Sequence, residues 1–370
     1  MLSEYYLLLA LEEARKANPL EVRPNPLVGA ILVDENQSIV GRGYHKKVGT
    51  PHAEIHAIED AKNNGADLTK CTLYVTLEPC SHHGKTPPCT DLIIRSRIPV
   101  VVVASRDPNP LVSGFEVLQK ANITVEFVHL EEVDQLNKVF LVNQQQDRPF
   151  FALKMAISIN GMIGKKDVGR FWLSNKHSRQ FVHEHLRKET DAILTTAKTV
   201  IQDNAKMNIR VEGEDEQELN LVVVDRGLQL LQEENKGLSI FYPRNKTKIY
   251  LVTDLAVDLG HDRTDVEVLV VPFTVDGRVD VSVLGKRLLE KQFCHVLVEA
   301  GAMLGQSMLK EDIIDEVHLF VAPTHIEEND GITFLHIDNL NIVEESLKGF
   351  MLSKKEEISG DQYLVFSKET

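Results

Sequence analysis

The first 146 residues alternate between two hydrophobic patterns that predict a repeating order of strands and helices. Continuous apolar runs of the kind found in buried strands occur at residues 28–33, 73–76, 100–103 and 123–128. Apolar residues at helical spacing occupy the segments between them, at residues 3–18, 52–63, 115–121 and 130–143. Proline favours the first turn of a helix, so we expect one helix to start at Pro51 and another at Pro87-Pro88. This alternation predicts an α/β fold with a largely buried sheet covered by helices on both faces.

The second part of the chain repeats the alternation with its own set of elements. Apolar strands are predicted at residues 150–156, 192–194, 221–225, 249–252, 268–271 and 295–299. Helices are predicted at residues 179–189 and 302–309. The polar segment 144–149 interrupts the pattern between the two parts. We therefore predict two domains, residues 1–146 and residues 147–370.

Length and composition narrow the class of protein. The chain has 370 residues, 43% hydrophobic and 26% charged, which is typical of a globular protein with two domains. A net charge of −14 argues against nucleic acid and anionic membranes as partners. The apolar stretch Leu7–Leu11 has acidic neighbours and no basic region before it, so it does not read as a signal peptide, and we expect a cytoplasmic protein.

The stretch from Pro51 to Cys89 carries the first candidate chemistry. Four cysteines in 370 residues do not form a disulfide framework, but two of them, Cys80 and Cys89, flank a loop rich in His and Pro. Together with His52 they offer zinc three ligands and leave a fourth position open, which is the catalytic pattern. Glu54 lies two residues after His52, so both can serve one ion only if it sits over the tip of their helix. A His-x-Glu sequence followed by paired cysteines is the pattern of zinc deaminases.

One other interpretation of this stretch remains open. His82 or His83 can supply a fourth ligand and close the site, which would make the zinc structural. In that case the protein is an interaction module and Glu54 is dispensable.

A glycine turn in the second domain is the other candidate site. The strand at residues 295–299 ends near Gly301 and feeds a helix, so its backbone N–H groups are available to a phosphate. The spacing to Gly305 is not that of the dinucleotide-binding fingerprint, and such turns are more often a packing feature.

The motifs around the cysteines resemble a known family. His52-Ala53-Glu54 and the run from Thr76 to Cys89, TLEPCSHHGKTPPC, are similar to the bifunctional riboflavin-biosynthesis deaminase/reductases. The segments Leu153–Ala156 and Ser158–Gly161 resemble the opening of the reductase half. The resemblance implies a cytidine-deaminase-like α/β/α domain followed by a dihydrofolate-reductase-like α/β domain. The sequence departs from the family pattern at Asn160, at Asp203-Asn204-Ala205 and at Arg170-Phe171.

The resemblance also implies cofactors and site residues. It implies one zinc per chain on His52, Cys80 and Cys89, with Glu54 as the catalytic residue. NADPH would be bound by Ala156, Trp172, Thr199, Asp203, Gly301, Ala302, Met303, Leu304, Gly305, Gln306 and Ser307. Substrate would be bound by Asn25, His82, His83, Lys85, Lys154, Arg187, Met207, Arg210 and Glu299.

The implied reactions are consecutive. The first is hydrolytic removal of the 2-amino group from a diaminopyrimidinone that carries a phosphoribosylamino arm, and the second is reduction of the ribosyl group to ribityl by NADPH. Expected partners are these small molecules and further copies of the chain, as a dimer or tetramer, with no nucleic acid or membrane. The rival hypothesis is a single-function nucleobase or nucleoside deaminase whose C-terminal domain only binds.

Overall fold

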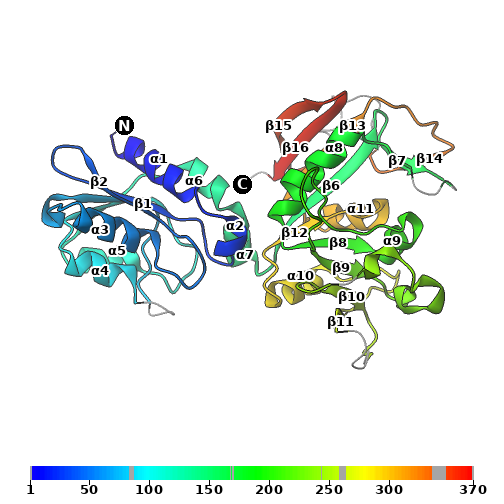
Figure 1. The fold of residues 1–370 in the computed structure, drawn as a ribbon, viewed down its shortest axis with the longest axis horizontal. Coiled ribbons are helices and arrows are strands. Elements are labelled where there is room, and N and C mark those ends of the chain that lie inside the picture. Colours follow the sequence, from blue (N-terminus) through cyan, green and yellow to red (C-terminus); the bar gives the residue numbers. More distant parts are fainter. Residues whose placement is uncertain are drawn as a thin grey trace. The chain divides into compact units, whose positions relative to one another are not determined.

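The computed structural model describes residues 2–82, 87–166, 168, 171–242, 244–257, 264–335 and 347–368. Within them the chain forms two compact units, residues 1–147 and 148–370 (Figure 1). No helix among the described segments combines the length and apolar composition needed to cross a membrane.

The first unit is built on a five-stranded sheet in the order β2-β1-β3-β4-β5. Its strands are β1 (Gly29–Val33), β2 (Ile39–Tyr44), β3 (Thr72–Leu77), β4 (Val100–Ser105) and β5 (Thr124–Phe127). Its helices are α1 (Leu2–Ala14), α2 (Pro19–Val22), α3 (Ala53–Asn63), α4 (Cys89–Arg95), α5 (Gly114–Lys120), α6 (Glu131–Leu136) and α7 (Lys138–Gln146). Strand β1 is antiparallel to β2 and β3, whereas β3, β4 and β5 are parallel.

Helices cover both faces of this sheet, as the buried strand runs predict. Helices α3, α4 and α5 pack on one face, and α1 and α6 pack on the other (Figure 1). Gly43 allows α3 to pack closely on the sheet, because a Cβ at that position would lie 2.3 Å from the Ala53 carbonyl oxygen. The absence of a side chain at Gly43 therefore lets the N-terminal end of α3 rest directly on β2.

Three of the predicted helices differ from those in the structure. Helix α3 begins at Ala53, with His52 as its N-cap, and not at Pro51. The helix predicted at residues 130–143 is broken at Asn137, whose buried amide accepts from Leu27 N–H (2.8 Å) and donates to Leu27 O (3.0 Å). The helix predicted at residues 179–189 is a short α-helix followed by a π-helical turn and a 3₁₀ turn.

The second unit contains a nine-stranded sheet in the order β11-β10-β9-β8-β12-β6-β13-β16-β15. The first seven strands in that order run parallel, and β16 and β15 continue the sheet antiparallel. The strands of this unit are β6 (Phe150–Ser158), β7 (Met162–Lys165), β8 (Ala192–Thr196), β9 (Asn220–Val224), β10 (Ile249–Thr253), β11 (Val266–Val270), β12 (His295–Val298), β13 (Glu316–Ala322), β14 (Gly331–Thr333), β15 (Phe350–Ile358) and β16 (Asp361–Lys368). Its helices are α8 (Lys176–Phe181), α9 (Ala197–Asp203), α10 (Val281–Glu290) and α11 (Ala302–Lys310).

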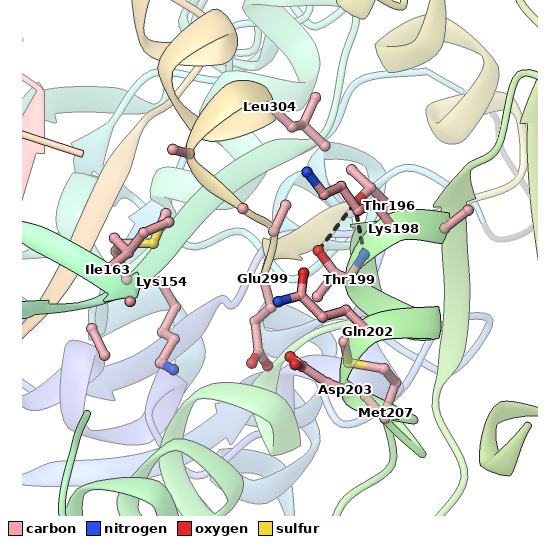
Figure 2. Close-up of a pocket in the computed structure, with 18 of the residues that line it drawn as sticks. Lys154, Ile163, Thr196, Lys198, Thr199, Gln202, Asp203, Met207, Glu299 and Leu304 are labelled. Carbon is pink, nitrogen blue, oxygen red and sulfur yellow. Dashed lines mark hydrogen bonds between the residues drawn. The ribbon is translucent and has the colours of Figure 1, made fainter. Parts of the chain in front are cut away.

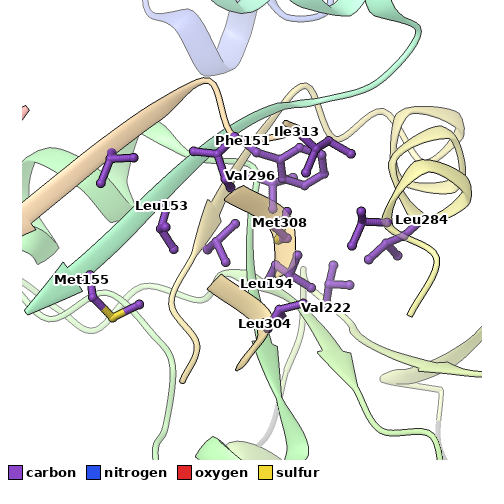
Figure 3. Packing of buried hydrophobic residues seen from close by; sticks show 14 of the residues in the cluster. Phe151, Leu153, Met155, Leu194, Val222, Leu284, Val296, Leu304, Met308 and Ile313 are labelled. Carbon is purple, nitrogen blue, oxygen red and sulfur yellow. The ribbon is translucent and has the colours of Figure 1, made fainter. Parts of the chain in front are cut away.

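Two hydrophobic clusters hold the helices of this unit to its sheet. Helices α10 and α11 pack on one face, where Leu284 and Met308 meet Phe151 and Val296 of the central strands (Figure 3). Helix α9 packs on the other face through Ala197 and Val200. The carboxyl ends of the parallel strands lie together on one side of the unit. Open α/β sheets bind their ligands at these carboxyl ends.

Candidate functional sites

A cluster of one histidine and two cysteines lies at the N-terminal ends of two helices in the first unit. His52 caps α3, Cys89 begins α4, and Cys80 follows β3. His52 Nδ1 lies 3.6 Å from Cys80 Sγ and 3.3 Å from Cys89 Sγ, and the three ligand atoms are all within 4.8 Å of one another. Zinc bonds of ordinary length in tetrahedral geometry place N and S ligands about 3.6 Å apart. The three side chains therefore fit a zinc ion.

Hydrogen bonds adjust the protonation of this cluster. The Cys89 side chain is the main partner that lowers the pKa of the Cys80 thiol to about 4, and the Cys89 backbone N–H also donates to Cys80 Sγ at 3.3 Å. The same contact with Cys80 raises the pKa of Cys89. A thiolate at Cys80 is the form that binds metal.

Glu54 lies beside this cluster in the first turn of α3. Its side chain is buried and is a hydrogen-bond partner of the Cys89 thiol. Burial raises the pKa of the Glu54 carboxyl above its ordinary value. A carboxyl held this way next to a metal-binding cluster is suited to proton transfer.

Asn25 and His45 add polar side chains next to this cluster. Asn25 Nδ2 lies 3.1 Å from His45 Nε2, and the His45 ring stands edge-on to His52 with ring centroids 5.2 Å apart. Asn25 was a predicted site residue, whereas nothing in the sequence around His45 indicated a role. Of the loop residues predicted to meet substrate, His82 is exposed, and His83 and Lys85 lie outside the described residues.

A cavity of about 1330 Å³ opens at the edge of the second unit's sheet (Figure 2). It lies where the parallel strands end: Thr196 ends β8, Asp225 follows β9, and Glu299 and Gly301 follow β12. The predicted residues that line it are Lys154, Ala156, Trp172, Arg187, Thr199, Asp203, Met207, Arg210, Glu299, Gly301, Ala302, Met303, Leu304 and Ser307. Most of the residues predicted for two ligands are therefore brought to one cavity.

A buried ion pair forms one end of the cavity. Glu299 and Arg187 make a two-pronged contact, Nε to Oε1 at 2.6 Å and Nη2 to Oε2 at 3.0 Å. Although burial opposes the charge of Glu299, the guanidinium holds the pKa of its carboxyl at about 2. Lys154 and Asp203 point toward the same part of the cavity as Glu299 (Figure 2), and burial lowers the pKa of the Lys154 amine. Charged side chains of both signs thus surround a space open to ligand.

The turn at Gly301 forms another part of the lining. Gly301 is the N-cap of α11, and a Cβ at its position would meet nothing within 4 Å. The nine-residue helix begins at the cavity, whose lining also includes Thr199 and Trp172. The space and the backbone N–H donors at a helix start fit the phosphates of a dinucleotide.

Two of the residues predicted to bind the cofactor, Gly305 and Gln306, lie apart from the lining. A Cβ at Gly305 would be 3.2 Å from the Phe334 ring, so this glycine faces the core. Gln306 Nε2 donates to Phe334 O at 2.8 Å. Asn160, where the family pattern has an acid, bonds the backbone of Ile326 through both ends of its amide and stabilises a turn.

Comparisons with known proteins agree with the division of the chain. Residues 2–105 match the cytidine and deoxycytidylate deaminase zinc-binding region, and residues 149–335 match the RibD C-terminal domain. The riboflavin biosynthesis protein RibD of Aquifex aeolicus is 36% identical over 98% of this chain and 97% of its own. The protein of the same name from Escherichia coli is 34% identical over 87% and 88%.

Two solved structures are similar along the entire chain. A diaminohydroxyphosphoribosylaminopyrimidine deaminase/5-amino-6-(5-phosphoribosylamino)uracil reductase from Thermotoga maritima superposes with a TM-score of 0.81 at 31% identity, covering 100% of this chain and 99% of that one. RibD of Acinetobacter baumannii gives a TM-score of 0.79 at 27% identity, with the same coverage.

Proposed function

Because this chain belongs to the RibD family of riboflavin biosynthesis proteins, we propose that it performs two successive reactions on one phosphoribosylated pyrimidine. It is an enzyme with a zinc-dependent deaminase activity and an NADPH-dependent reductase activity. The deaminase is assigned to residues 1–146 and the reductase to residues 147–370. The observation that carries the proposal is the convergence of His52, Cys80, Cys89 and buried Glu54 in one unit, with a separate charged cavity in the other.

In the first reaction, the substrate is 2,5-diamino-6-(5-phosphoribosylamino)pyrimidin-4(3H)-one, which loses its 2-amino group as ammonia. His52, Cys80 and Cys89 would hold one zinc, and a bound zinc would supply a water of lowered pKa at neutral pH. Glu54 would take one proton from the water and pass it to the ring nitrogen, and would then carry the remaining hydroxyl proton to the amine, which leaves as ammonia. Asn25 holds the pyrimidine ring, and His45 orients the Asn25 amide through their 3.1 Å contact.

In the second reaction, the ribosyl group of the deaminated product is reduced to ribityl, with hydride supplied by NADPH. The Gly301 turn, Thr199 and Trp172 line the cavity and would hold the cofactor. Lys154, Asp203 and Glu299 position the sugar chain, and Arg187 fixes the orientation of Glu299. We also propose that the protein is a cytoplasmic homo-oligomer that binds no nucleic acid, which the net charge of −14 favours.

The test is to disable each unit separately. Glu54→Gln should still oxidise NADPH when supplied with the deaminated intermediate, and Glu299→Gln should still release ammonia from the first substrate. Mixing the two variants should restore the full conversion if the intermediate diffuses between them. If Glu54→Gln lost NADPH oxidation while its circular dichroism stayed unchanged, two independent sites would have to be abandoned.

The rival hypothesis of a single-function deaminase predicts a different result in the same assay. It predicts ammonia release with no NADPH oxidation under any condition. The match of residues 149–335 to the RibD C-terminal domain disfavours it.

A further inference from the structure

His183 lines the cavity of the second unit from a π-helical turn, Val182–Leu186. Its side chain is buried, and both ring nitrogens lie close to Arg210. Nδ1 lies 3.0 Å from the Arg210 backbone nitrogen, and Nε2 lies 3.4 Å from Arg210 Nη2. π-Helical turns are rare and are frequent at functional sites, because they redirect one side chain within a helix.

The protonation of the ring follows from these contacts. A backbone N–H can only donate, so Nδ1 must accept and the proton of a neutral imidazole sits on Nε2. Burial and the charges of Arg187 and Arg210 lower the pKa of the His183 ring to about 3, which keeps it neutral. Arg210 Nη2 is also a donor, because a guanidinium has no acceptor. Two N–H donors therefore lie 3.4 Å apart, on two residues that both line the cavity.

We infer that His183 Nε2–H and the Arg210 guanidinium together bind the phosphate monoester of a ligand in the reductase cavity. A phosphate oxygen placed between them would accept from both donors, and a charge-assisted bond of this kind is stronger than a neutral one. The inference rests on the proposed reductase function for the identity of the ligand. It adds His183 to the residues that the resemblance implies for substrate.

The position within the cavity favours the substrate as the source of the phosphate. His183 is close enough to Glu299, Arg187 and Lys154 for their charges to act on its ring. Arg210 Nη1 also donates to the Asn208 side-chain oxygen, which fixes the guanidinium at this end. The other possible source is the 2′-phosphate of NADPH, and the experiment separates the two.

The experiment compares two substitutions that each keep one half of the imidazole. His183→Asn retains an acceptor for the Arg210 backbone N–H but loses the distal donor, whereas His183→Gln retains a donor near the position of Nε2. Calorimetric binding of ribose 5-phosphate should weaken roughly 10- to 100-fold in His183→Asn, the usual cost of a hydrogen bond to a charged group. It should stay within about threefold of wild type in His183→Gln, and unphosphorylated ribose should not distinguish the proteins.

Each other outcome has a defined meaning. Unchanged ribose 5-phosphate binding in His183→Asn, with an unchanged ratio of NADPH to NADH affinity, would overturn the inference. A loss confined to the NADPH/NADH ratio would support the phosphate site and assign it to the cofactor. Equal losses in both variants would overturn it, because they would indicate a purely structural role in holding Arg210.

A measurement on the unmodified protein keeps the inference testable if His183→Asn does not fold. The ¹⁵N signals of the His183 ring, assigned from their absence in His183→Gln, should show the Nε2–H form and shift on addition of ribose 5-phosphate. No shift at saturating ligand would overturn the inference. Binding through His183 without any NADPH oxidation would refute the proposed function alone.

Discussion

Replacing Glu299 by Gln should destabilise the second unit by about 3 kcal/mol at neutral pH. The Glu299 carboxyl has a pKa of about 2 in the folded chain against an ordinary value of 4.5, and each pKa unit corresponds to 1.36 kcal/mol. The pair is nearly enclosed, with side-chain exposures of 9% for Arg187 and 12% for Glu299, so solvent screens it little. Glutamine is close in size to glutamate and mainly removes the charge, which leaves the Arg187 guanidinium buried without its carboxylate.

The lowered pKa of Glu299 also determines how the stability should change with pH. Because the folded pKa is depressed, the stabilisation is fully present above about pH 4.5 and is lost as pH falls toward 2. Wild-type stability should therefore fall steeply across that window, and Glu299→Gln should show a shallower fall.

Unfolding of the second unit can be followed through Trp172, the only tryptophan of the chain. Urea titrations at pH 7 and at several values between 2 and 5 would give both quantities. Glu316→Gln is a useful control, because it removes another buried carboxylate of the same sheet, one that contacts His318. Equal stability of Glu299→Gln and wild type at pH 7, with identical pH profiles, would refute the account of this ion pair.

The remaining predictions concern the two sites. Cys89→Ala should lose the bound zinc measured by metal analysis, whereas Cys71→Ala, a buried cysteine of the same unit outside the cluster, should retain it; full zinc in Cys89→Ala would exclude the ligand set. Glu54→Gln should keep zinc and fold but release ammonia roughly 10²–10⁴-fold more slowly, and a near wild-type rate would remove Glu54 from the mechanism. Gly114→Ala should weaken zinc retention against a chelator without affecting NADPH oxidation, because its Cβ would lie 2.1 Å from Pro79 O, next to Cys80; unaltered retention would show that this loop adjusts freely. NADPH should quench Trp172 fluorescence in a saturable way, and quenching that never saturates would argue against a site in this cavity.

Local sequence was enough to predict the zinc cluster and most of the strands, although β2, β7 and the strands from β13 to β16 were not predicted. Most of the continuous apolar runs became buried strands, and β4, for example, has every residue from Val101 to Ser105 buried. The run at residues 123–128 was predicted wrongly, because Thr124, Glu126 and Phe127 of the edge strand β5 are exposed. The open His and Cys set was predictable because two of its ligands, His52 and Cys89, lie at helix starts that the prolines and the apolar pattern indicate. Cys71 and Cys294, which lie just before strands β3 and β12, are buried.

Features that depend on distant partners could not be predicted in this way. The break at Asn137 is caused by Leu27, 110 residues away in the chain. Arg187 and Glu299 are 112 residues apart, and neither neighbourhood indicates the other. His45 and His183 gain their roles only when folding brings them to Asn25 and Arg210, so local hydrophobic patterns carry no signal for them.

The central claim is that one chain contains both activities, and one measurement tests it directly. The purified protein is given 2,5-diamino-6-(5-phosphoribosylamino)pyrimidin-4(3H)-one and NADPH, and ammonia and NADPH are followed together. We predict that NADPH oxidation follows ammonia release and reaches one mole per mole of ammonia. Ammonia release with no oxidation of NADPH would contradict the claim and leave a single-function deaminase.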